Sequence, residues 1–204
     1  MPLRCPAAPF IIALVLLFGA APVPAQAPST PRAGSAMPDP DRPLPRQPGD
    51  AFGQEITLPP RTVIYLKGHA KWDNAFDTLV DAHKSLRLYF DKQGIQPNGL
   101  AMTIYTETDD TGFDFLAALP ITAVPPNPPK GDIAVGQAPS GKALKFVHRG
   151  SYDAIDMTYE EITDYLDDNG LEAKDKFIEE YVTDILKTSP DNLVVKIFVP
   201  VKQP

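Results

Sequence analysis

The hydrophobic pattern passes through the same series of changes in two separate parts of the chain. In the second part, an apolar segment at 143–148 precedes a helical pattern from Tyr152 to Asn169, and apolar segments follow at 177–182 and 193–199. A period of three to four residues predicts a helix with one buried face, and short apolar runs bounded by glycine or proline predict strands. The buried stripe of the helix consists of Ile155, Tyr159, Ile162 and Leu166.

The first part repeats the order strand, helix, strand, strand. A strand at 62–67 ends at Gly68, a helix runs from Asp73 to a stop at Gly94, and strands follow at 100–106 and 113–119. Apolar side chains on the helix recur at helical spacing, at Phe76, Leu79, Val80, Leu86 and Phe90. Short extended segments at Ile56 and Ile133 precede the two parts. We therefore expect two βαββ units, at about 55–122 and 132–201.

Five pairs of positions match between the two units in the same order, which indicates an internal repeat. They are Lys67-Gly68 with Arg149-Gly150, Trp72 with Tyr152, Gln93-Gly94-Ile95 with Asn169-Gly170-Leu171, Tyr105 with Tyr181, and Leu119-Pro120-Ile121 with Val199-Pro200-Val201. The connector from Ala123 to Gly131 contains four prolines and is too short to separate independent domains. We expect one α+β domain at 54–204 in which the units share a core.

The residues before this domain have the features of export. Arg4 precedes an uncharged apolar run from Phe10 to Gly19, and small residues suited to cleavage follow up to Ala27. The run is shorter than the roughly 20 residues of a membrane-spanning helix. We expect residues 1–27 to be a signal peptide and the protein to be periplasmic or secreted; an uncleaved anchor is the alternative. The proline-rich stretch 28–53 predicts a disordered linker.

Composition excludes several classes of function. The net charge of -7 and the absence of a lysine and arginine cluster argue against nucleic acid as a partner. The single cysteine, Cys5, excludes an intramolecular disulfide and a cysteine-rich zinc site. The three histidines lack metal-ligand spacing, and His83 lies on the buried helical stripe, where we expect a hydrogen-bonded core histidine. We expect no metal and no cofactor.

Three motifs in the second unit resemble those of the GyrI-like small-molecule-binding domains, which are also the effector-binding domains of AraC-type and MerR-type regulators. They are Gly150-Ser151-Tyr152 before the helix, Glu179-Glu180-Tyr181 in the third strand, and the final Val199-Pro200-Val201. The resemblance implies an antiparallel sheet from two pseudo-twofold βαββ units, with both helices on one face and a ligand cleft on the other. It also implies binding of hydrophobic, often cationic, compounds, and it identifies Glu179 with the pocket glutamate of the family.

Strand alternation places Phe177, Glu179 and Tyr181 on one face. Pseudo-symmetry brings Tyr105 near Tyr181 and places the neutral Thr103 where the other unit has Glu179. A carboxylate among aromatic residues either pairs with a cation or has a raised pKa. The alternative is that Glu179 is a solvated strand residue.

Trp72 and Tyr152 follow glycine breaks at the starts of the two helices. They either stack on a ligand in the cleft or pack in the core beneath the helices. With them, the candidate ligand-binding residues are Glu179, Tyr181, Tyr105, Trp72, Tyr152 and Phe177.

The leading hypothesis is an exported monomer that binds a hydrophobic or cationic amphipathic molecule between the units. One alternative is a hydrolase of strained electrophilic small molecules, with Glu179 as general base and Tyr181 or Tyr105 as hydrogen-bond donor. Another is a protein-interaction module that uses the sheet face. We expect no contact with nucleic acid, because 1–53 is assigned to signal and linker, and none with the membrane after signal cleavage.

Overall fold

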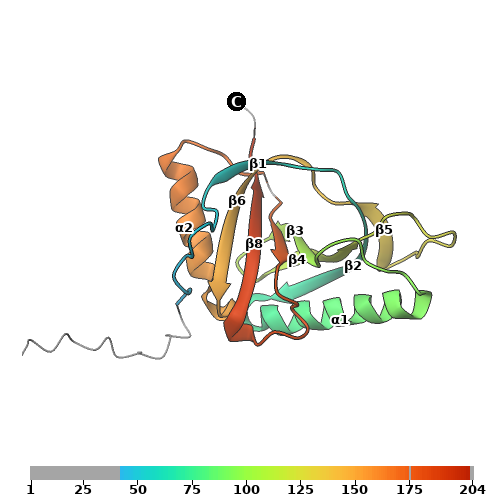
Figure 1. Ribbon diagram of the computed structural model, residues 1–204. Helices are drawn as coiled ribbons and strands as arrows, with labels where there is room; N and C mark the ends of the chain where they lie inside the picture. The colour runs from blue at the N-terminus through green and yellow to red at the C-terminus, as the bar shows by residue number, and fades with distance from the viewer. Residues whose placement is uncertain (1–41, 175, 203–204) are drawn as a thin grey trace, which may run out of the picture. The chain divides into compact units, whose positions relative to one another are not determined.

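The structure is a computed structural model that describes residues 42–174 and 176–202 (Figure 1). The predicted signal peptide and the first part of the predicted linker lie outside these residues. In the described part, eight strands and two helices form an α+β domain. The elements are β1 (Gln54–Leu58), β2 (Thr62–Lys71), α1 (Ala75–Gln93), β3 (Met102–Thr108), β4 (Gly112–Pro120), β5 (Ile133–Gln137), β6 (Gly141–Gly150), α2 (Ile155–Asp168), β7 (Ile178–Tyr181) and β8 (Leu193–Pro200).

The strands form one antiparallel sheet in the order β1-β6-β8-β7-β3-β4-β2-β5. The two units meet in the middle, where β3 pairs with β7 and Thr103 lies opposite Glu179. The first strand of each unit pairs with the second strand of the other, since β1 pairs with β6 and β5 with β2. The halves therefore share one continuous sheet, as the short connector predicted.

Both helices pack against the same face of the sheet. Leu79 of α1 and Ile162 of α2 belong to one buried cluster with sheet residues that point to a single side, among them Tyr105, Tyr181 and Val199. Each helix buries most of the predicted stripe, whereas Phe76, Val80 and Tyr159 are only partly buried. Gly94 adopts a left-handed conformation at the end of α1, with φ of 64°, which glycine tolerates without strain. None of the described helices has the length and hydropathy needed to cross a bilayer.

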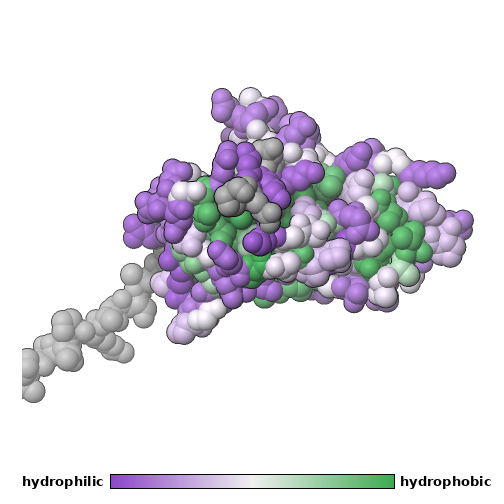
Figure 2. All heavy atoms as spheres, turned by 90° about the horizontal axis from the view of Figure 1, so that it is seen from above, coloured by the Kyte–Doolittle hydropathy of each residue, from purple (hydrophilic) through white to green (hydrophobic). Residues whose placement is uncertain are grey.

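The opposite face of the sheet closes on a second buried cluster. Met102, Ile104, Ile178 and Phe198 fill it together with Leu58 and other apolar residues. The expectation that a ligand cleft lies on this face is wrong, because these side chains occupy the space. The interaction-module hypothesis would use this same face, of which Ile56, Tyr65 and Leu116 are only partly buried. The surface seen in Figure 2 is mainly hydrophilic, with apolar residues showing between polar ones.

Gly68 does not end its strand as predicted. β2 continues to Lys71, and the ring of Phe115 lies over Gly68 so closely that a Cβ there would be 2.4 Å from the ring carbon Cζ. The glycine is therefore required by an aromatic neighbour across the sheet. The match of Lys67-Gly68 with Arg149-Gly150 is also displaced by two residues. A 3-10 turn begins at Trp72 in one unit and at Tyr152 in the other, and this offset pairs Gly150 with Ala70.

Residues 42–53, which we call the N-terminal strap, pack along α2 and β6 (Figure 1). The ring of Phe52 contacts Phe146 and Tyr165 edge-on, at centroid distances of 5.0 and 5.7 Å. The side chain of Arg149 donates two hydrogen bonds to Asp50, at 2.6 and 2.8 Å. The prediction of a disordered linker is therefore wrong for this part, because the aromatic and charged residues within it anchor it to the domain.

Candidate ligand-binding site

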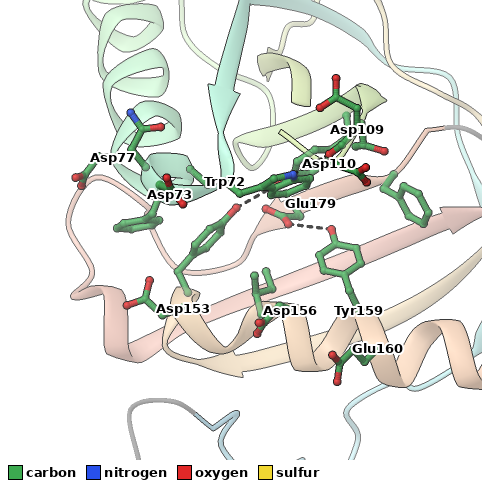
Figure 3. A pocket seen from close by; sticks show the side chains of 18 of the residues that line it. Trp72, Asp73, Asp77, Asp109, Asp110, Asp153, Asp156, Tyr159, Glu160 and Glu179 are labelled. Atoms are coloured by element: carbon green, nitrogen blue, oxygen red, sulfur yellow. Dashed lines mark hydrogen bonds between the residues drawn. The ribbon is translucent and has the colours of Figure 1, made fainter. Parts of the chain in front are cut away.

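A cavity of about 1120 Å³ opens between the N-terminal ends of the two helices (Figure 3). One wall comes from residues 72–77 and the other from the segment that begins at Tyr152 and continues into α2, while Tyr105 and Glu179 form part of the floor. The cavity lies on the helix-bearing face, because Glu179 and Tyr105 point to the same side as the buried helical residues. Its size suits a drug-sized ligand.

The repeat places an aromatic residue on each side of the opening. In each unit a strand ends, a 3-10 turn begins with an aromatic residue, and the helix starts three residues later. Trp72 lies at the rim, is 48% exposed, and donates from Nε1 to the carbonyl of Asp109 at 2.8 Å. Tyr152 lies deeper, and its hydroxyl is 3.1 Å from that of Tyr105. The Ser151 hydroxyl caps its turn by accepting from the backbone of Asp153 at 3.2 Å.

Glu179 is fully buried and is held by phenol hydroxyls. Tyr159 of α2 donates to Oε1 at 2.9 Å, and Tyr181 of β7 donates to Oε2 at 3.0 Å. Burial raises the pKa of Glu179, while the hydroxyls of Tyr159, Tyr105 and Tyr181 act in the opposite direction by hydrogen bonding to the carboxylate. No lysine, arginine or histidine occurs among the described residues that line the cavity. The charge of Glu179 therefore has no cationic partner among these residues.

The neighbouring Glu180 has the opposite environment. Its side chain points to the other face of the sheet, where Arg61 donates to Oε2 at 2.6 Å and Lys196 lies 3.5 Å from Oε1. Glu180 is thus a paired structural carboxylate, whereas Glu179, one position away, faces a cavity without a cation. Alternation along one strand separates the two roles.

Four buried tyrosines lie around the carboxylate, and all are neutral. Burial raises the pKa of Tyr105, Tyr152, Tyr159 and Tyr181 well above the ordinary phenol value, and the charge of Glu179 adds to this effect. These groups therefore keep their protons over the physiological range. Tyr159 and Tyr181 donate O–H hydrogen bonds to Glu179, while Tyr105, Tyr152 and Tyr159 line the cavity.

Acidic residues surround the mouth of the cavity (Figure 3). Asp109 stabilises its own turn by accepting from the backbone amides of Thr111 and Gly112, at 2.7 and 3.0 Å. The other acidic residues there include Asp73, Asp77, Asp110, Asp153, Asp156 and Glu160. Their field favours positively charged solutes near the opening. Among the described residues, no group of three metal-ligating side chains is arranged to hold a metal ion.

Five of the six predicted site residues line this cavity, namely Trp72, Tyr105, Tyr152, Phe177 and Glu179. The sixth, Tyr181, lies beneath Glu179 and contacts it through its hydroxyl. The sequence prediction missed Phe76 and treated Tyr159 as a core position, although both line the cavity. The hydroxyl of Tyr159 was the available signal, because a polar tip on a buried stripe needs a partner.

Solved structures of known proteins share this fold. EcmrR in its DNA complex aligns with a TM-score of 0.63 and 18% identity, over 74% of this chain and 57% of that one, so this chain spans less than two thirds of it. The EcmrR C-terminal domain aligns with a TM-score of 0.57 and 18% identity, over 74% of this chain and 97% of the domain. The protein SAV2435 bound to tetraphenylphosphonium aligns with a TM-score of 0.51 and 17% identity, over 73% and 93% of the two chains.

Family comparison agrees with the fold and with the resemblance seen in the motifs. No curated protein is significantly similar to this sequence. Residues 54–202 match the GyrI-like small molecule binding domain, which covers all eight strands and both helices. The chain therefore belongs to the GyrI-like family of small-molecule-binding domains.

Proposed function

We propose that this protein is an exported binding protein that holds a hydrophobic cation in the cavity between α1 and α2. The observation that carries the proposal is the buried Glu179, whose hydrogen-bond partners are all uncharged phenols. An isolated carboxylate in an apolar site is costly, and a bound cation relieves that cost. The ligand would supply the charge that Arg61 and Lys196 supply to Glu180.

The aromatic walls support the same class of ligand. Trp72, Phe76 and Phe177 present ring surfaces to the cavity, and the faces of such rings attract cations. A flat or aryl-substituted cation would gain apolar contact as well as the charge interaction. The similarity of the fold to SAV2435, whose structure contains tetraphenylphosphonium, is consistent with a ligand of this shape.

Two substitutions on adjacent residues separate binding from stability. Glu179→Gln keeps the shape and removes the pocket charge, so it should weaken tetraphenylphosphonium by roughly tenfold to a hundredfold, since a hydrogen bond to a charged group contributes about 1.5–3 kcal/mol. Glu180→Gln, the matched control, should leave binding unchanged and lower the melting temperature, because Arg61 loses its charged partner. Titration calorimetry and thermal melts measure both effects.

A neutral analogue of the same shape completes the experiment. Its affinity should change little in Glu179→Gln, because that substitution preserves the apolar contacts. Equal losses for the cationic and neutral compounds would mean that Glu179 only shapes the cavity. Equal cation binding by Glu179→Gln and wild type would refute the proposal.

A second candidate is hydrolysis of a strained electrophile in the same cavity. Its support is the raised pKa of Glu179, which brings a carboxylate closer to the range in which a general base is effective. Tyr181 or Tyr105 would then donate a hydrogen bond to the developing oxyanion. Turnover of an electrophilic probe that disappears in Glu179→Gln would favour this function, whereas saturable binding without turnover would favour the binding protein.

Export is the remaining part of the proposal and rests on the sequence of residues 1–27. Cleavage would leave a mature protein that begins near Gln26 or Pro28. N-terminal sequencing of the protein from its native envelope fraction tests this directly. A cytosolic protein that still begins at Met1 would contradict export without affecting the cavity assignment.

A further inference from the structure

His83 and Thr103 have polar groups in the core that the binding proposal leaves unused. His83 lies on the inner face of α1 and is 2% exposed, and Thr103 of β3 is completely buried. Nε2 of His83 is 3.1 Å from Oγ1 of Thr103, which is itself 2.8 Å from the hydroxyl of Tyr181. Tyr181 donates to Glu179. An unbroken line of hydrogen bonds thus joins α1 to the floor of the cavity.

The direction of each hydrogen bond in this line follows from its last member. An ionised Glu179 only accepts, so the Tyr181 hydroxyl must donate to it. The oxygen of Tyr181 then accepts from Thr103, whose single proton is used there. Thr103 in turn accepts from Nε2–H of His83. Burial lowers the pKa of His83 to about 4, so the ring is neutral and carries its one proton on Nε2.

The second buried histidine shows what an ordinary structural site looks like in this protein. His148 has partners for both ring nitrogens, with Nδ1 2.8 Å from Oγ1 of Thr158 and Nε2 3.0 Å from the carbonyl of Ser151. His83 has no partner for Nδ1 among the described residues. An unsatisfied buried nitrogen destabilises the folded protein. Stability alone therefore does not explain why a histidine occupies position 83.

We propose that His83 and Thr103 are positioning residues that hold the Tyr181 proton toward Glu179 and so keep the carboxylate in the cavity ionised. The consequence for ligands rests on the proposed function, because an ionised Glu179 is what attracts a cation. A tyrosine that accepts one hydrogen bond is a stronger donor in the next. The line therefore offsets part of the effect of burial on Glu179.

Besides this line, the groups that face Glu179 are neutral phenols and the acidic residues at the mouth of the cavity, and substitution of Thr103 removes none of them. Tyr159 of α2, Tyr105 of β3 and Tyr152 before α2 also surround the carboxylate, and all are neutral. His83 is affected by Arg87 on its own helix and by Asp184 after β7. Neither charged residue lines the cavity that contains Glu179.

Titration of Glu179 in the ligand-free protein tests the proposal. The carboxyl carbon is followed by NMR of protein made with isotope-labelled glutamate, and Glu179→Gln assigns its signal. Thr103→Val, which removes only the hydroxyl, should raise the midpoint by roughly 0.2–0.6 of a pH unit. Thr103→Ser should restore the wild-type midpoint. Thr158→Val removes the equivalent hydroxyl beside His148 and should leave the midpoint unchanged.

Substitution of the histidine gives an independent check. His83→Leu should raise the midpoint as Thr103→Val does, while His83→Gln, whose amide can donate to Thr103, should not. Equal midpoints for Thr103→Val and wild type, or equal shifts in Thr103→Val and Thr158→Val, would overturn the proposal. Because no ligand is present, these results are independent of whether the cavity binds a cation.

Discussion

The packing of the N-terminal strap predicts that its one aromatic residue stabilises a domain whose family match begins only at residue 54. Phe52→Ala removes a ring that sits edge-on between Phe146 and Tyr165 and lies under the guanidinium of Arg46, 3.6 Å from the ring centroid. Its loss would leave these neighbours without a partner on one side. The free energy of unfolding should fall.

The contacts bound the size of the effect. Truncation of a fully buried phenylalanine to alanine costs about 3–5 kcal/mol. Phe52 is only partly buried, which places its value below that range. The two ring contacts alone contribute about 1–3 kcal/mol at 0.5–1.5 kcal/mol each. We therefore expect a loss of about 2–3 kcal/mol, or a fall in melting temperature of roughly 4–12 °C for a domain of this size.

Denaturant unfolding followed by circular dichroism measures this loss. Leu88→Ala is the control, since Leu88 is 53% exposed on α1 and should change stability by no more than about 0.5 kcal/mol. A loss in Phe52→Ala no larger than in the control would show that the strap is not part of the cooperative fold. The reasoning from ring packing would then be wrong.

Three further outcomes follow from buried or close-packed groups. Burial lowers the pKa of His83 from 6.5 to about 4, so the stability of the protein should be highest above pH 6.5 and should fall by up to about 3 kcal/mol as the pH drops to 4. His83→Gln should flatten this part of a curve of stability against pH. Both proteins should carry Glu179→Gln, because the raised pKa of Glu179 changes stability in the opposite direction. Gly68→Ala should destabilise the protein by about 1–3 kcal/mol in chemical denaturation, because the new Cβ meets the ring of Phe115; an unchanged midpoint would contradict this. Trp72→Ala should weaken an aryl cation about twofold to fivefold by calorimetry and lower the melting temperature modestly, because the ring also contacts Phe113 and donates to the carbonyl of Asp109; equal affinities of variant and wild type would contradict a role in binding.

The fold could largely be predicted because most of its helices and strands are indicated by short stretches of sequence. Helical spacing in α1 and α2 and short apolar runs bounded by glycine or proline indicated the elements before any contact was known. Gly68 shows where local information ends. A glycine in a strand is typical of a break, and only the ring of Phe115 from β4 explains why the strand continues. The strap was misjudged similarly, because its prolines are visible in the sequence while the anchors Phe146 and Arg149 are distant.

Most of the residues that line the candidate cavity were predicted, but the face of the sheet on which the cavity lies was not. Alternation shows that Glu179 and Tyr181 share a face, yet it does not show which face carries the helices. That choice depends on how the helical stripes pack, which is a property of the assembled sheet. Tyr159 was assigned only to the core because it lies on the same helical stripe as Ile162. Its ring packs against the core, but its hydroxyl reaches Glu179.

The exchange of first strands between the units affects how the chain can fold. β1 must find β6, from Gln54 opposite Lys145 to Leu58 opposite Gly141, and β5 must find β2 across a shorter separation. Pairing at such sequence distance slows folding, because a long loop closes before the contacts stabilise it. Each half supplies the strand that covers the edge of the other half, since β1 pairs with β6 and β5 pairs with β2. A chain cut at the proline-rich connector should therefore yield two fragments that fold only when mixed.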